Sequence, residues 1–252
     1  MVADNRTSTL LVCALNAEGE TLSALKKQVE DGKAIVRVTG VGDHAVRSST
    51  ASLPVPSVAA VISWGVCGAL NAQLSPGDLV LPSKVMGETG EVYTCDLSWR
   101  DDLHHAFKEA DSSLKVLTGS LINSNEVVTD AAAKLALQQR SNADVVDMES
   151  LAVARFARTH NIPFIVVRAV SDGASHSLPK AAMLPAGQSD VSLSTVFRAL
   201  SRPMQWPALI RTARQFKQGL SSLSRAAQML PNDILLNNAD LITAQRVNRV
   251  VK

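Results

Sequence analysis

The sequence predicts a single α/β domain in which a mainly parallel or mixed central sheet is covered by helices on both faces, a three-layer arrangement. Short unbroken apolar runs alternate with helix-like segments, and such strands occur where both faces of a sheet are buried. The 252 residues are 46% hydrophobic, enough for one large core. The net charge of +2 gives no reason to expect a nucleic-acid partner.

The predicted strands and helices follow one another along the first two thirds of the chain. Runs rich in strand formers occupy residues 9–15, 34–40, 58–70, 77–86, 114–122, 144–148 and 163–172. Segments with apolar residues at helical spacing occupy residues 18–30, 43–53, 102–110, 129–140 and 149–160. Pro54 closes the second helix, and Thr129 or Asp130 is expected to cap the fourth.

The character of the chain changes after about residue 190. From Val191 to Asn232 there is no acidic residue, whereas arginines and lysines recur and apolar residues return every three or four positions. This pattern predicts a basic amphipathic helix within 201–230. We therefore divide the chain into a flexible N-terminus (1–8), an α/β domain (9–190) and a basic helical extension (191–252) packed on or beside the domain.

Cysteine and histidine usage gives no sign of a disulfide framework or a metal site. The three cysteines are widely spaced without a CxxC motif, and the five histidines lack metal-ligand spacing. The start of the chain, "MVADNRTST", lacks the apolar core of a signal peptide, and no apolar run reaches the length of a membrane span. We expect a cytoplasmic protein without metal or cofactor, with the inner face of the membrane as a candidate location.

Unusual residues gather where the predicted strands end. In parallel α/β sheets, ligands bind beyond the carboxyl ends of the strands, so these residues are expected to share one site. They are Glu18, Gly40, Gly42, Gly65, Val66, Cys67, Gly68, Met148, Glu149, Ser171 and Asp172.

Three of these features have competing interpretations. "GVGDHA" (40–45) fits a dinucleotide-binding turn, but the acid expected about 20 residues later is missing, which argues against a nicotinamide enzyme. The alternatives are a tight strand–helix turn and, as we favour, glycines whose backbone approaches a small ligand. Cys67 has no base placed near it, so a small buried residue is the better interpretation. Glu149 is either a carboxylate used at a helix start or an ordinary first-turn acid. Arg168 lies inside an apolar strand and should have a buried acceptor.

Several motifs together resemble a known family. "ALNAE" (14–18), "GVG" (40–42), "GVCGAL" (65–70) with "PGDLVLP" (76–82), "DMES" (147–150) and "IPFIVVRAVSDGAS" (162–175) occur in the order found in the nucleoside phosphorylase/nucleosidase superfamily. The chain resembles most the branch of methylthioadenosine/S-adenosylhomocysteine nucleosidases. With its C-terminal part it is similar to the bacterial hopanoid-associated phosphorylases, which are thought to remove adenine from adenosylhopane.

The resemblance implies a role for each of these residues. Asp172 would protonate N7 of the leaving purine, so we expect its pKa to be raised. Glu18 would activate the nucleophile, and Met148 and Glu149 would hold the ribose. The rest of the substrate site would consist of Gly65, Val66, Cys67, Gly68, Arg168 and Ser171. Gly42 and Arg47 would border a pocket for phosphate or water.

The sequence also departs from the family pattern. Val66 stands where relatives usually carry a hydroxyl, Ala69 where they carry glycine, and Ile62-Ser63-Trp64 where phosphorylases carry a phosphate-binding arginine. Glu18 favours water as the nucleophile, whereas the resemblance to phosphorylases favours phosphate as a co-substrate. Hydrolysis and phosphorolysis therefore both stay open.

Three functions are compatible with these residues. The first is cleavage of adenine from a nucleoside with a large apolar 5′ group, such as adenosylhopane. The second is a general methylthioadenosine/S-adenosylhomocysteine nucleosidase, and the third is a nucleoside-binding protein that has lost catalysis. The helix at 201–230 would touch a membrane surface, or else pack on the core or on a second subunit. The resemblance implies a homo-oligomer.

Overall fold

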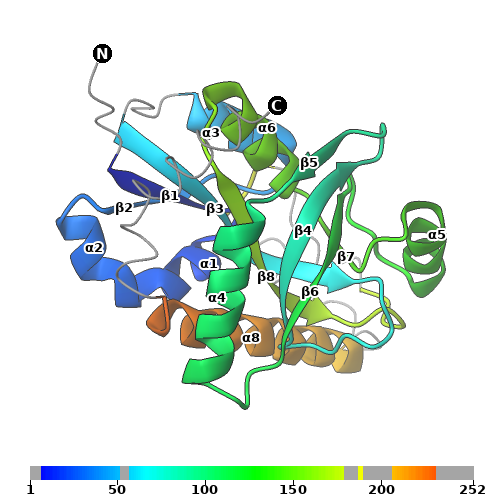
Figure 1. Ribbon diagram of the computed structural model, residues 1–252. Helices are drawn as coiled ribbons and strands as arrows, with labels where there is room; N and C mark the ends of the chain where they lie inside the picture. The colour runs from blue at the N-terminus through cyan, green and yellow to red at the C-terminus, as the bar shows by residue number, and fades with distance from the viewer. Residues whose placement is uncertain (1–6, 52–56, 179–186, 190–205, 231–252) are drawn as a thin grey trace.

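A computed structural model describes residues 7–51, 57–178, 187–189 and 206–230 of the protein (Figure 1). Eight strands form one mixed sheet, with β8 paired to both β3 and β4. The strands are β1 (Ser8–Cys13), β2 (Ala34–Val38), β3 (Val58–Ala69), β4 (Leu79–Gly87), β5 (Val92–Thr94), β6 (Val116–Asn123), β7 (Val145–Asp147) and β8 (Phe164–Asp172). The mixed α/β class predicted from the apolar runs is confirmed.

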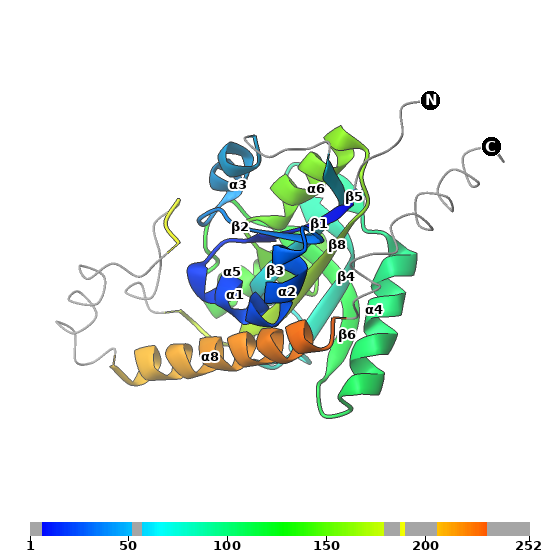
Figure 2. The same cartoon turned by 90° about the vertical axis from the view of Figure 1, so that its left-hand side faces the viewer.

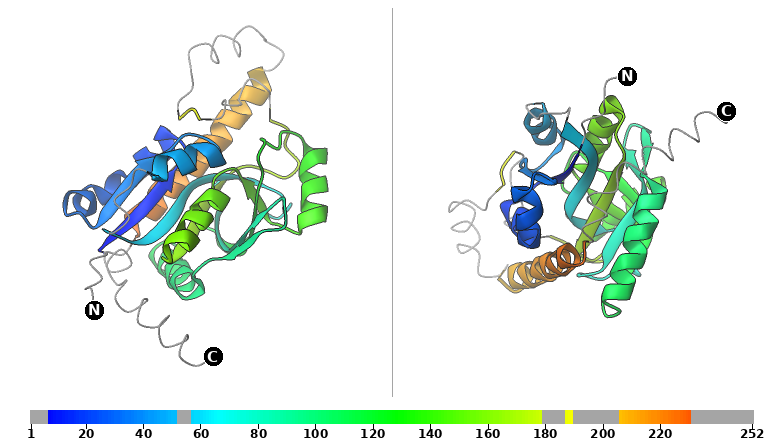
Figure 3. Two further views of the ribbon diagram at one scale, coloured as in Figure 1. Left: turned by 90° about the horizontal axis from the view of Figure 1, so that it is seen from above. Right: turned by 60° about the vertical axis from the view of Figure 1, so that its left-hand side comes forward.

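The strand pairing closes part of the sheet into a ring. β3 pairs with β7, β7 with β6, β6 with β4, β4 with β8, and β8 again with β3. β1 and β2 extend the sheet beyond β3 in parallel. The strands curve around this ring in the view from above (Figure 3). The sequence predicts the strands and their mixed character, but not the closure, which depends on long-range antiparallel pairs.

The helices occupy nearly the positions expected from their periodicity. They are α1 (Asn16–Glu20), the 3-10 helix η1 (Thr21–Leu25), α2 (Lys26–Glu30), α3 (Asp43–Thr50), α4 (Leu97–Ala110), α5 (Ala131–Ser141), α6 (Ser150–His160) and α8 (Trp206–Gln228). The predicted helix 18–30 is thus split into three pieces. Asp130 caps α5, because its Oδ1 accepts a hydrogen bond from the Ala133 amide at 2.8 Å.

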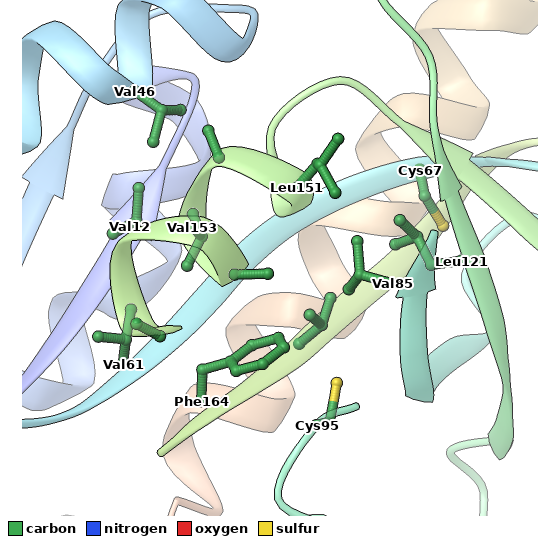
Figure 4. Close-up of a cluster of buried hydrophobic side chains, with 14 of the residues drawn as sticks. Val12, Val46, Val61, Cys67, Val85, Cys95, Leu121, Leu151, Val153 and Phe164 are labelled. Carbon is green, nitrogen blue, oxygen red and sulfur yellow. The ribbon is translucent and has the colours of Figure 1, made fainter. Parts of the chain in front are cut away.

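The two larger of three apolar clusters lie on opposite faces of the sheet, and the third, smaller one includes Leu70, Ile122 and Leu137. On one face α3 and α6 cover a cluster that includes Val12, Val46, Val61, Val153 and Phe164 (Figure 4). On the other face η1, α4 and α8 cover a second cluster that includes Leu25, Trp64, Trp99, Phe107 and Leu223. The chain therefore has the layers expected of strands that are buried on both faces.

Helix α8 lies along the second face of the sheet (Figure 2). It contacts β8 and η1, and the residues that it buries are Ser222, Leu223, Ala226 and Ala227, with Leu230 just beyond its end. Its outer side exposes Ile210, Arg211, Arg214 and Lys217. The rest of the basic extension, 191–205 and 231–252, lies outside the described residues. In the described ranges no helix combines the length and apolarity needed to cross a membrane.

Candidate active site

Three contacts join the strand ends that the sequence places far apart. The Val66 amide donates to Glu18 Oε1 at 2.8 Å, and the Gly42 amide donates to Glu149 Oε1 at 2.8 Å. Gly68 lies so close to Asp172 that a Cβ at this position would be 3.3 Å from Asp172 Oδ2. The structure therefore gathers the predicted residues of β1, β2, β3, β7 and β8 at one end of the sheet.

Glu18 is buried and held by backbone amides. Its Oε2 accepts hydrogen bonds from the amides of Ala14 and Leu15, both at 2.9 Å, in addition to the Val66 bond on Oε1. Burial raises the pKa of Glu18, and the positive charge of Arg168 and the three amide bonds oppose this rise. A carboxyl with a raised pKa and fixed geometry suits a general base that takes a proton from water.

Arg168 supplies the positive charge beneath Glu18. Its Nη2 contacts Asp147 Oδ2 at 2.6 Å and donates to the hydroxyls of Ser63 at 2.8 Å and Ser150 at 3.0 Å. Burial by itself lowers the pKa of Arg168, but Asp147, Glu149 and Glu18 outweigh that effect and raise it. The expected buried acceptor of Arg168 is therefore Asp147.

Glu149 is at the start of α6 but does not cap that helix. Its carboxylate reaches across to the Gly42 amide at the start of α3, while Oε2 accepts from the Met148 amide at 3.3 Å. Burial, followed by the charge of Asp147, raises the pKa of Glu149 to about 7, and Arg168 opposes the rise. Glu149 is thus poised to change its charge near neutral pH.

Asp172 ends β8 and meets two donors. Ser171 Oγ donates to Asp172 Oδ1 at 2.8 Å, and the ammonium of Lys134 forms an ion pair with Oδ2. Both side chains of this pair are buried. The ammonium and the carboxylate therefore compensate each other's charge in a buried part of the site.

Two glycines of β3 allow close contacts with the side chains of the site. A Cβ at Gly65 would meet Arg168 Nη1 and lie 2.5 Å from Glu18 Oε1. A Cβ at Gly68 would be 3.3 Å from both Asp172 Oδ2 and Val146 Cγ1. The glycine-rich segment therefore lets β3 pass close to the carboxyls of Glu18 and Asp172 without displacing either one.

The remaining predicted residues have different environments. Cys67 is buried, and burial raises the pKa of its thiol, in agreement with a structural residue rather than a nucleophile. Met148 is half-buried beside Glu149. Arg47 points away from these groups: 63% of its side chain is exposed, and its Nε contacts Asp43 Oδ2 at 3.0 Å. The structure does not bring Arg47 to Glu18 or Glu149.

Sequence reasoning missed four residues that support the site. The sequence patterns give no reason to assign a role to Asp147, Ser63 or Ser150, yet all three hold Arg168. The fourth residue is Lys134, which lies within the predicted helix 129–140. The spacing in α5 does indicate that Lys134 is buried. Residues three positions apart share one face of a helix, and Leu137 lies on the buried face.

The charges within the described part of the site do not balance. Four buried carboxyl groups share the site with two buried cations, and the six residues are Glu18, Asp147, Glu149, Asp172, Lys134 and Arg168. Four ionised carboxylates would leave two negative charges without partners in a region of low dielectric. Burial accordingly raises the pKa of Glu18, and it raises the pKa of Glu149 to about 7. The excess of carboxyl groups is suited to stabilise positive charge that develops on a bound molecule.

Comparisons with known proteins place this site in a family. Residues 17–190 match the family described as the Phosphorylase superfamily, so the chain belongs to that superfamily. A 5′-methylthioadenosine/S-adenosylhomocysteine nucleosidase of Buchnera aphidicola is 29% identical over 54% of this chain and 64% of its own length. The nucleosidase of Bacillus thuringiensis strain 97-27 is 26% identical over 62% of this chain and 76% of its own. These relatives are enzymes.

Solved structures agree on the fold. The 5′-methylthioadenosine/S-adenosylhomocysteine nucleosidase of Neisseria meningitidis, solved with methylthio-immucillin-A, superimposes with a TM-score of 0.67 at 16% identity, over 89% of this chain and 98% of that one. The S-adenosylhomocysteine nucleosidase of Streptococcus pyogenes superimposes with a TM-score of 0.60 at 18% identity, over 91% of this chain and 99% of that one. The nucleoside phosphorylase-like fold predicted from the motifs is therefore confirmed.

Proposed function

We propose that this protein hydrolyses the N-ribosyl bond of an adenine nucleoside. The proposal rests on three carboxyls that meet at one end of the sheet. Glu18 and Asp172 lie against the glycine segment of β3, and Glu149 accepts from the Gly42 amide. Arg168 acts electrostatically on both Glu18 and Glu149. Glu18 activates the nucleophile, Glu149 binds the ribose hydroxyls, and Asp172 faces N7 of the purine. The names of the related nucleosidases support the same substrate class.

The reaction needs groups of these kinds. Breaking a ribose–purine bond builds positive charge on the sugar and negative charge on the departing base, as in glycoside hydrolysis. Excess carboxylates around the sugar stabilise the first charge, and a proton delivered to N7 neutralises the second. Met148 packs beside Glu149 and offers an apolar wall to the ribose.

We favour water over phosphate as the nucleophile. A phosphate dianion next to Glu18 and Glu149 would be repelled unless an arginine were free to bind it. Arg168 is already engaged by Asp147, Ser63 and Ser150, and Arg47 pairs with Asp43 at the surface. Water carries no such charge and can share a pocket with the Glu18 carboxyl.

For the 5′ substituent we favour a large apolar group, as in adenosylhopane. The support is the outer side of α8, where Ile210 is 53% exposed beside Arg211, Arg214 and Lys217, and no acidic residue lies between Trp206 and Gln228. An apolar residue with a cationic border suits contact with anionic headgroups, where a lipid-linked substrate would be embedded. The alternative is methylthioadenosine or S-adenosylhomocysteine, which the related enzymes are named for. A homo-oligomer remains part of the proposal.

The test is release of adenine from adenosylhopane, methylthioadenosine and S-adenosylhomocysteine, each with and without inorganic phosphate. We expect the highest kcat/KM with adenosylhopane, and free ribose rather than ribose 1-phosphate at the sugar end. Faster cleavage of methylthioadenosine overturns the lipid assignment, and a requirement for phosphate overturns hydrolysis. A wild-type protein that binds adenine but cleaves none of the three supports the non-catalytic alternative.

A further inference from the structure

Lys134 is buried where the pattern of α5 would place a hydrophobic residue. Its side chain is 1% exposed, whereas the adjacent Leu135 is 57% exposed. A lysine is almost never fully buried unless it is paired, because removing an ammonium from water costs several kcal/mol. Something in the fold must therefore compensate for this burial.

The compensation comes from one short segment of chain. The three N–H donors of the Lys134 ammonium meet Asp172 Oδ2, the Gly173 carbonyl at 2.8 Å and the His176 carbonyl at 3.1 Å. All three acceptors belong to the end of β8 and the turn after it. Lys134 thus fixes both the carboxylate of Asp172 and the backbone that carries it.

We propose that Lys134 is the positioning residue that supplies the proton which Asp172 delivers to N7. The inference rests on the proposed function, because it assigns the source of the proton in that reaction. As the ribose–purine bond breaks and its electron pair moves onto the base, the Asp172 carboxylate takes a proton from the Lys134 ammonium. The same carboxyl group gives its proton to N7. Lys134 is left as a neutral amine, and Asp172 is again a carboxylate. After adenine leaves, Glu18 releases to solvent the proton that it took from the attacking water, and solvent returns one proton to Lys134, so that the cycle closes.

The other groups around Asp172 are poorer proton sources. The Ser171 hydroxyl touches Oδ1, but an alcohol is far too weak an acid for this step. The Cys67 thiol, on the facing strand β3, has its pKa raised by burial. His176 directs its carbonyl to Lys134, and its ring Nδ1 is 3.0 Å from Gln215 Nε2 of α8. Lys134 is the acid in direct contact with the carboxylate.

The experiment compares Lys134→Met and Lys134→Arg with wild type. Arg140→Gln is the matched control, because it removes from the same helix an exposed cation that pairs with Glu88 at the surface. At pH 8 we expect kcat/KM for adenine release to fall about 100-fold or more in both Lys134 variants, and to stay within about threefold in the control. At pH 5 Lys134→Met should recover most of the loss, because solvent then supplies the proton. Lys134→Arg should stay slow at pH 5, because its guanidinium keeps the neighbouring carboxylate ionised.

A second substrate separates proton supply from structural support. A riboside of 4-nitrophenol has a leaving group that departs without protonation, so both Lys134 variants should cleave it at close to the wild-type rate. Lys134→Arg keeps the cation for folding but holds its proton too tightly to release it. Equal losses at both pH values and on both substrates would mean that Lys134 only supports the fold, and unchanged rates would mean that it is idle. Either result with an active wild type overturns this inference alone, whereas a wild type that releases no adenine overturns the proposed function as well.

Discussion

Replacing Asp147 with asparagine should destabilise the protein far more than its position at the end of a short strand suggests. Asp147 Oδ2 is 2.6 Å from Arg168 Nη2, and both side chains are almost completely buried. The variant leaves a buried guanidinium without its main counterion, and breaking such a pair costs about 3–5 kcal/mol. The hydroxyls of Ser63 and Ser150 still accept from Arg168, so we expect the lower end, about 3 kcal/mol.

Urea denaturation and thermal unfolding measure this loss. For a chain of this size, about 3 kcal/mol corresponds to a fall in Tm of roughly 6–12 °C. Asp144→Asn is the matched control, because Asp144 accepts hydrogen bonds from the Ser120 amide and from Asn71 without pairing with a charge. That variant should lose about 1 kcal/mol. If the two variants unfold at the same urea concentration, the ion pair with Arg168 does not carry the stability assigned to it.

The remaining predictions concern the pH dependence, the nucleophile, the glycine segment and α8. Because the pKa of Glu149 is raised from 4.5 to about 7, its contribution to stability is fully present below pH 4.5 and is lost as the pH rises through 7. The unfolding free energy should fall by up to about 3 kcal/mol across this window, and Glu149→Gln should remove that slope. Glu18→Gln should lower kcat/KM by about 100-fold to 10,000-fold while adenine affinity in equilibrium titration is retained; an active variant would exclude Glu18 as the base. Gly65→Ala should displace Glu18 and Arg168, cost roughly 1–3 kcal/mol in denaturant titration and abolish turnover; normal turnover would contradict the close packing. Replacing Arg211, Arg214 and Lys217 together by glutamine should weaken sedimentation with phosphatidylglycerol vesicles by about 100-fold; unchanged binding would remove the lipid surface from the proposal.

Local patterns were sufficient to predict most of the fold. The buried strand β3 and the amphipathic α6 follow directly from apolar runs and helical spacing, since each buries one continuous set of side chains. The three-residue β5 is too short to leave such a pattern, and its strand character comes from pairing with β4. The ring closure likewise depends on contacts between distant segments, which no local pattern records.

Residues of the candidate site that follow the ends of strands could be predicted from the sequence. Buried residues that form ion pairs with other site residues could not. Glu18, Glu149 and Asp172 follow from the rule that ligand sites lie beyond the carboxyl ends of strands. In α5 the charged Lys134 is buried and the apolar Leu135 is exposed, which is the opposite of the usual arrangement. The buried ammonium of Lys134 is stabilised by Asp172, which lies 38 positions later in the sequence. Arg47 was chosen for its charge and its proximity in sequence to Gly42, but α3 turns it toward solvent and Asp43.

The closed ring of strands also limits how the protein can associate with other extended chains. In the described part of the chain, the path of paired strands ends at β2 and β5, so these are its free edges. β5 has three residues and offers little template for another strand, while β2 carries Arg37 in its middle, a residue type that discourages edge-to-edge pairing. The apolar strands β3 and β8 are internal, which protects the most apolar segments of this sequence from cross-β aggregation.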